Sequence, residues 1–120
     1  MNNPNEPRLE KDALGAIEIA PDALWGIHTQ RALNNFPTTA RRVPQVLIGS
    51  IAVVKHAAAV TNAELGFLKR DVADAIVAAC AKICEGGPEI ERHFPLDALQ
   101  GGAGTSTNMN VNEVIANLAL

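Results

Sequence analysis

Two long amphipathic patterns occupy the middle of the chain. Pro44 stands where the first turn of a helix accepts proline and Gly66 supplies a stop, so the spacing predicts a helix over residues 44–66. Its apolar positions recur at helical intervals, at Leu47, Ile51, Val54 and Ala58. A second helix is predicted over residues 71–86, with Asp71 as a possible cap and a stripe of Val72, Ile76, Ala79, Cys80 and Ile83. Because the link between them is short, the two helices are expected to pack antiparallel.

A third helix is predicted from residues 105–107 to the end of the chain. Its apolar face comprises Val111, Val114, Ile115 and Leu118. The opposite side carries Asn110, Glu113 and Asn117, with Asn108 and Asn112 at the border. Each asparagine costs up to ~0.7 kcal/mol relative to alanine in a helix, so we expect a partly buried hydrogen-bond network to explain them. The pattern reaches the last residue without a stop signal, and we therefore expect a fragment of a longer protein.

The N-terminal part lacks such long patterns. Turn-forming residues divide it into short apolar pieces, namely Gly15, Pro21 and Gly26. This predicts a short extended or hairpin segment, with a strand at residues 16–20. Residues 1–11 are polar and carry both signs of charge, which is typical of a flexible leader. The predicted fold class is mainly α, with one domain over residues 12–120.

Composition narrows the range of partners. Hydrophobic residues make up 48% of the chain and charged residues 19%, and the net charge is −3, so neither nucleic acid nor an acidic membrane surface is an expected partner. The longest apolar segment is interrupted by Lys55 and His56 and falls short of the ~20 residues of a membrane span. With no secretory signal, we expect a cytoplasmic protein. Cys80 and Cys84 are expected to be reduced core residues, and no metal site is predicted, because the histidines supply no cluster at ligand spacing.

The stretch "QGGAGTSTNMNVNE", residues 100–113, carries the candidate chemistry. It fits neither phosphate-loop pattern, because no Lys follows Gly104 and Thr107 stands where the dinucleotide pattern needs glycine. Glycines still allow close backbone approach, and a helix N-terminus offers unpaired N–H groups and positive potential to an anion. A carboxylate is a plausible ligand. Ordinary helix capping by Ser and Thr explains the same residues, and both interpretations stay open here.

The residues also resemble a known family. "GGAGTSTNMNVNEVIANLAL" (residues 101–120) closely resembles the corresponding segment of aspartate ammonia-lyases, in the aspartase/fumarase superfamily. The likeness continues through "APDALWGIHTQRALNNFP", "VVKHAAAVTNAELG", "DAIVAAC" and "HFPLDALQGG". It implies the N-terminal helical domain of that fold and a reversible conversion of L-aspartate to fumarate and ammonia. It further implies no cofactor and, for the full-length enzyme, a homotetramer.

The resemblance also implies roles for individual residues. Thr105 is expected to bind a substrate carboxylate, beside the backbone of Ala103 and Gly104, with Ser106 as a weaker ligand. Thr107 and Asn108 are expected to serve in capping and the amide network. Arg31 matches an arginine that assists with a carboxylate in this family, and a surface or subunit salt bridge is the alternative. His28 is expected to be structural.

The family's catalytic base is a Ser on a later signature, "GSSxMPxKxN", which does not occur in these 120 residues. No catalytic residue is therefore assigned here, and the chain alone is expected to be inactive. Ser106 favours an aspartase, since the related fumarate hydratases usually carry Gln after the Gly-Thr pair. Trp25 is more typical of a hydratase, so a class II fumarate hydratase is one alternative. A non-catalytic, self-associating helical module is another.

Overall fold

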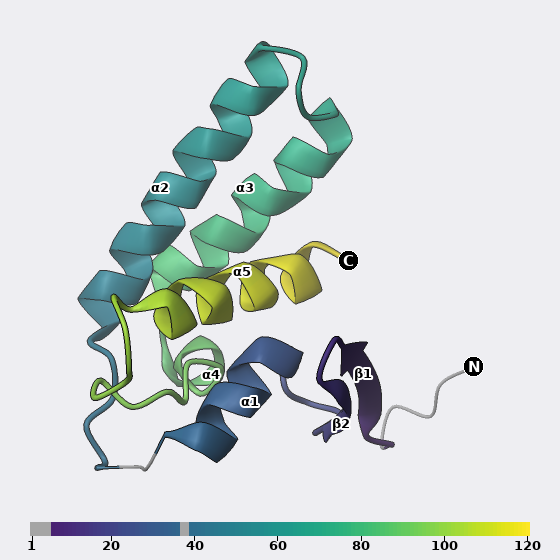
Figure 1. Cartoon of the computed structure of the whole chain (residues 1–120). Helices are drawn as coiled ribbons and strands as arrows, with labels where there is room; N and C mark the ends of the chain where they lie inside the picture. The colour runs from purple at the N-terminus through teal and green to yellow at the C-terminus, as the bar shows by residue number, and fades with distance from the viewer. Residues whose placement is uncertain (1–5, 37–38) are drawn as a thin grey trace.

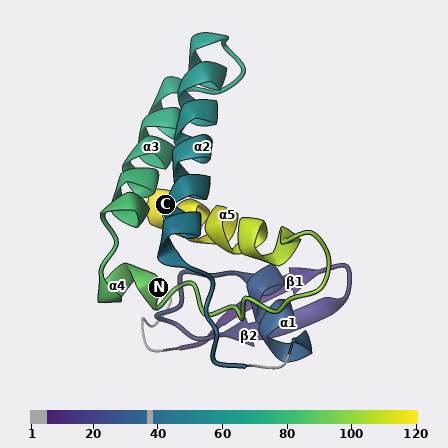
Figure 2. The same cartoon turned by 90° about the vertical axis from the view of Figure 1, so that its left-hand side faces the viewer.

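The computed structural model describes residues 6–36 and 39–120. A two-stranded hairpin and α1 precede a long helical hairpin, and α5 crosses the base of that hairpin (Figure 1). The elements are β1 (Arg8–Asp12), β2 (Gly15–Ile19), α1 (Ile27–Asn35), α2 (Gln45–Glu64), α3 (Arg70–Glu85), α4 (Pro88–Glu91) and α5 (Thr105–Ala119). Figure 2 shows α2 and α3 rising side by side from a lower layer of α1 and the two strands. The mainly helical fold with an N-terminal hairpin is confirmed.

The predicted helical hairpin is confirmed as α2 and α3. Gly66 lies in the link with a φ of 78°, a left-handed conformation that glycine adopts without strain. The prediction that Asp71 caps this helix is wrong. α3 begins at Arg70, one residue before the predicted start, and its N-cap is Lys69, which makes no side-chain capping hydrogen bond. Asp71 lies instead within the first turn, where a negative charge suits the helix dipole.

The core lies where α2, α3 and α5 meet. It includes Ile48, Ala52, Ala79, Cys80, Ile83, Phe94, Val111, Val114 and Ile115. The apolar face predicted for α5 is confirmed, with Leu118 packed at its edge. Of the stripe predicted for α2, only Ile51 packs against the core, and the other three residues are exposed. Ile48 and Ala52 are buried instead. Apolar residues occur on every side of α2, so periodicity alone does not select its core face.

The outer side of α2 is long and apolar. By length and composition alone, α2 is the one helix of residues 6–36 and 39–120 that could cross a membrane, and only 17% of its most apolar window is buried. In length and mean hydropathy the segment thus reaches the level of a span despite Lys55 and His56, contrary to the sequence analysis, while the absence of a membrane partner stays a prediction. The same pattern is typical of a helix that packs against further protein.

The N-terminal hairpin changes the predicted domain boundary. β1 pairs antiparallel with β2, from Arg8 opposite Ile19 to Asp12 opposite Gly15. The strand predicted at residues 16–20 is confirmed as β2. The leader predicted over residues 1–11 is wrong from residue 8 onward, because those residues form β1; residues 1–5 lie outside the described part of the chain.

The two cysteines differ in their surroundings. Cys80 is buried in the core, as expected, and burial raises the pKa of its thiol, which favours the protonated form. Cys84 is exposed, so its assignment to the core is wrong. Within the described residues, no group of three or more His, Cys, Asp or Glu side chains could hold a metal ion.

Candidate functional site

The glycine-rich loop leads directly into the first turn of α5. Gly102 and Gly104 have φ values of 77° and 79°, a left-handed conformation that a side chain would strain. Gly104 occupies the N-cap position, and no side chain bonds that cap. The loop thus delivers the chain to Thr105, the first helical residue, without covering the helix N-terminus.

The Gln100 side chain connects the two ends of this loop by hydrogen bonds. Its Oε1 accepts hydrogen bonds from the Thr107 backbone N–H at 3.0 Å and from the Thr107 hydroxyl at 3.1 Å, while its Nε2 donates to the Asp97 carbonyl at 2.9 Å. The Asp97 carboxylate in turn accepts from the Leu99 N–H at 2.8 Å and the Thr39 hydroxyl at 2.9 Å. These N–H and O–H donors hold the pKa of Asp97 below its usual range, the Leu99 bond contributing most. The interpretation that Ser or Thr side chains cap α5 is therefore wrong, because Gln100 from the preceding loop accepts from the first turn instead.

The predicted ligand residues lie together at the start of α5. Ala103 and Thr105 are exposed, Gly104 is half-buried, and Ser106 is buried with 8% of its surface exposed. Among the described residues, the Thr105 and Ser106 hydroxyls and backbone N–H groups have no hydrogen-bond partner. Unpaired donors at a helix N-terminus suit an anion, and Thr105 presents its donors to solvent.

The polar side of α5 is partly buried against the N-terminal segment. Asn110 is 1% exposed and donates from Nδ2 to the His93 carbonyl at 3.0 Å. Asn117 donates from Nδ2 to the Leu24 carbonyl at 2.7 Å. The predicted amide network is confirmed for these two residues. Asn112 differs, since its amide contacts only the Met109 sulfur, at 3.8 Å.

Glu113, like Gln100, has a structural role that sequence reasoning missed. Its carboxylate accepts from the backbone N–H groups of Gly26 at 3.0 Å, His28 at 2.8 Å and Thr29 at 3.2 Å, and from the Thr29 hydroxyl. It therefore caps α1 from another helix and ties α1 to α5. The sequence held one indication of this role, since Glu113 shares a side of the predicted helix with Asn110 and Asn117.

Two carboxylates meet at this cap. Glu10 of β1 accepts from the Ile27 N–H at 2.8 Å, and its charge is paired with Arg8, also at 2.8 Å. A Cβ at Gly26 would lie 2.9 Å from Glu113 Oε1 and 3.0 Å from Glu10 Oε2. The extended backbone of Gly26 would accept other residues, so the close approach of both carboxylates is what favours glycine here.

Arg31 is engaged by the hairpin. Its Nε and Nη2 donate to the Asp12 carboxylate at 2.7 and 2.6 Å, and Nη2 also donates to the Gly15 carbonyl at 3.1 Å. The Arg31 hydrogen bond holds the pKa of Asp12 below its usual range. The structure thus shows Arg31 in a salt bridge with Asp12 of the same chain, which was the alternative to a role in substrate binding. A contact between Arg31 and substrate stays a prediction.

Two histidines lie close to the α1 segment. His28 Nε2 is buried without a hydrogen-bond partner in the described residues. His93 is 5% exposed, and its Nδ1 accepts from the Leu24 N–H at 3.2 Å. Burial, and then the Arg92 charge, lowers the pKa of His93, which favours the neutral ring that this bond requires.

Comparisons with known proteins connect this arrangement to a family. A family model described as lyase matches residues 15–120. A class II fumarate hydratase of Xylella fastidiosa is 47% identical over the whole chain, and an aspartate ammonia-lyase of a Bacillus species is 50% identical over 94% of it. The matches cover 25% and 24% of those relatives, so the chain spans about a quarter of their length.

Solved structures agree on the fold. A class II fumarase from Schistosoma mansoni superposes with a TM-score of 0.89 at 38% identity, over 95% of this chain and 24% of that one. A fumarate lyase:delta crystallin from Brucella melitensis gives a TM-score of 0.88 at 45% identity, over 94% of this chain and 26% of that one. Hydratases and ammonia-lyases match at similar identity. On its sequence and its fold, the chain belongs to the aspartase/fumarase superfamily of lyases.

Proposed function

We propose that this chain is the N-terminal part of an aspartate ammonia-lyase, which interconverts L-aspartate with fumarate and ammonia. In it, Thr105 binds a substrate carboxylate. The observation that carries the proposal is the exposed start of α5, where the Thr105 hydroxyl and the first backbone N–H groups lack acceptors. The glycine loop and the Gln100 cap hold these donors in place before a ligand arrives.

The chemistry explains why such donors are needed. Removing a proton from the carbon next to the β-carboxylate places a second negative charge on that carboxylate. Donors that already face the carboxylate stabilise this charge as it forms, at little reorganisation cost. Ala103 and Gly104 allow close approach of the backbone, and Ser106 can add a donor from the edge of the site. Arg31 stays a weaker candidate because Asp12 already binds its guanidinium.

These residues supply one wall of a site. The proton-abstracting Ser and the remaining ligands belong to signatures that the family carries elsewhere in a chain about four times as long. We propose that the longer protein is a cytoplasmic homotetramer that needs no cofactor. The 120-residue chain alone is expected to be inactive.

Ser106 supports the deamination of aspartate. The resemblance associates Ser after the Gly-Thr pair with aspartases and Gln with hydratases. A class II fumarate hydratase is the second candidate, supported by Trp25 and by relatives of that activity at 46–47% identity. An assay of the longer protein with L-aspartate and with fumarate distinguishes them. Malate formed from fumarate, with no ammonia released from aspartate, would replace the first proposal with the second.

Thr105→Val in the longer enzyme tests the ligand assignment. Val keeps the shape and removes the hydroxyl, so kcat/KM is expected to fall about 100-fold or more, as when one oxyanion donor is lost. Thr61→Val is the matched control: Thr61 is exposed in this chain and lies on α2 away from the start of α5, so the change should leave activity unchanged. Near-normal activity of the Thr105 variant would remove this residue from the site.

A further inference from the structure

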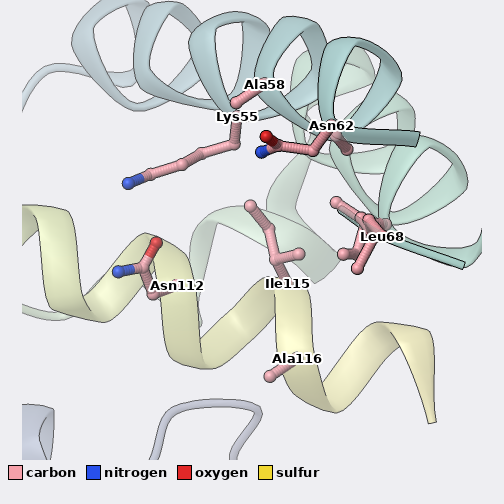
Figure 3. Close-up of a pocket in the computed structure, with 9 residues that line it drawn as sticks. Lys55, Ala58, Asn62, Leu68, Asn112, Ile115 and Ala116 are labelled. Atoms are coloured by element: carbon pink, nitrogen blue, oxygen red, sulfur yellow. The ribbon is translucent and has the colours of Figure 1, made fainter. Parts of the chain in front are cut away.

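A second feature of the fold has the properties of a ligand site. An open cavity of about 320 Å³ lies between α2, α3 and α5. Its apolar lining comprises Ala58, Ala59, Leu68, Ile76, Ile115 and Ala116. Figure 3 shows Lys55 and Asn62 reaching in from α2, and Asn112 from α5 on the facing side.

The polar side chains of this cavity are at least partly exposed and have few partners within the chain. Within residues 6–36 and 39–120, Lys55 has no ion-pair partner, and the Asn62 side chain makes no hydrogen bond. Asn112 has only the 3.8 Å contact with sulfur, which leaves its amide able to donate. No Asp or Glu lines the cavity. A positive charge with amide donors beside an apolar wall therefore faces the open space.

We propose that this cavity binds a small carboxylic acid with an apolar body. The carboxylate takes charge-assisted hydrogen bonds from Lys55 and the Asn112 amide. The apolar body lies over Ile115 and points toward Leu68. In Figure 3, Asn112, Ile115 and Leu68 follow one another along the cavity. Burying that body against apolar side chains supplies the remaining affinity.

The volume limits the ligand. At about 30 Å³ per water molecule, a cavity of about 320 Å³ holds roughly ten waters, and so a ligand of similar heavy-atom count. Hexanoate, with its six-carbon chain, is a suitable probe. A dicarboxylate fits less well, because its second charge would face the apolar wall, where only Asn62 can donate. The proposal does not depend on the lyase function.

The test is a titration of the 120-residue chain with hexanoate, followed by NMR of its methyl groups. We expect saturable shifts of the Ile115 and Leu68 methyls at millimolar ligand, and at least tenfold weaker binding of neutral hexan-1-ol. Lys55→Met should weaken hexanoate binding at least tenfold. Lys82→Met, which removes an exposed charge of α3 outside the cavity, is the matched control and should not.

Three results would overturn the proposal. One is equal hexanoate affinity in the Lys55 and Lys82 variants, with circular dichroism showing both folded; Lys55→Gln replaces the Met variant if that one does not fold. Another is fumarate binding here as tightly as hexanoate. The third is methyl shifts that follow protein concentration rather than ligand, which would mean that a second copy fills the cavity.

Discussion

The cap that Glu113 places on α1 can be tested by removing its charge or its whole side chain. One carboxylate satisfies three backbone N–H groups and one hydroxyl. Glu113→Gln keeps the shape but leaves one oxygen, and its NH₂ group must then face an N–H donor. Glu113→Ala removes every acceptor and leaves the donors of Gly26, His28 and Thr29 unpaired.

The expected magnitudes follow from these contacts. Hydrogen bonds to a charged group contribute about 1.5–3 kcal/mol each, and a charge at a helix N-terminus adds about 0.3–1 kcal/mol. Since the Gln variant keeps part of the network, its free energy of unfolding should fall by about 2 kcal/mol. The Ala variant should lose about 3–5 kcal/mol, a large part of the total stability of a domain this size.

Urea unfolding followed by circular dichroism measures both losses, and amide hydrogen exchange locates them. Protection should fall most at His28 and Thr29, while the α2 and α3 amides should lose no more than the change in global stability. Glu18→Gln, on the exposed side of β2, is the control and should change stability by less than about 0.5 kcal/mol. Wild-type stability and exchange in the Glu113→Gln variant would refute the capping role.

Three further predictions concern the same region. Because the pKa of His93 is lowered in the folded chain, its neutral ring adds stability that is complete above the unfolded pKa of about 6.5 and is lost as pH falls below it. Unfolding measured between pH 5 and 8 should show this slope, and His93→Gln should flatten it. Gln100→Ala should cost about 1–2 kcal/mol in urea unfolding and expose the Thr107 amide to exchange, whereas no loss would contradict the cap. Gly26→Ala should cost about 1–3 kcal/mol because its Cβ meets Glu113 at 2.9 Å; a stabilised variant would show that the carboxylate moves aside easily.

Local patterns predicted α2, α3 and α5, but they missed α1 and the short α4, whose segments were read as turns. The proline and glycine signals around α2 and the apolar face of α5 depend on residues close in sequence, so they are readable without the fold. The asparagines of α5 likewise indicated a buried network, because their cost in helix propensity needs a compensation. The core face of α2 was not predictable, since apolar residues surround that helix and its neighbours decide which are covered.

The errors in the candidate site have a common cause. Capping was sought in Ser and Thr at the helix start, but the structure uses Gln100 for α5 and Glu113 for α1. Long polar side chains reach helix ends from other segments, and sequence spacing does not reveal that. β1 was missed because its alternation becomes evident only when β2 pairs with it.

The long-range cap on α1 also sets an order of events during synthesis. Thr29 and Glu113 are separated by 84 residues, and Leu24 and Asn117 by 93. At about 5–20 residues per second, the start of α1 waits about 4–17 s on the ribosome before its acceptor has been made. Until then the N-terminal hairpin and α1 lack their attachment to the helical core. The nascent chain is therefore expected to assemble the α2–α3 hairpin first and to dock its own beginning last.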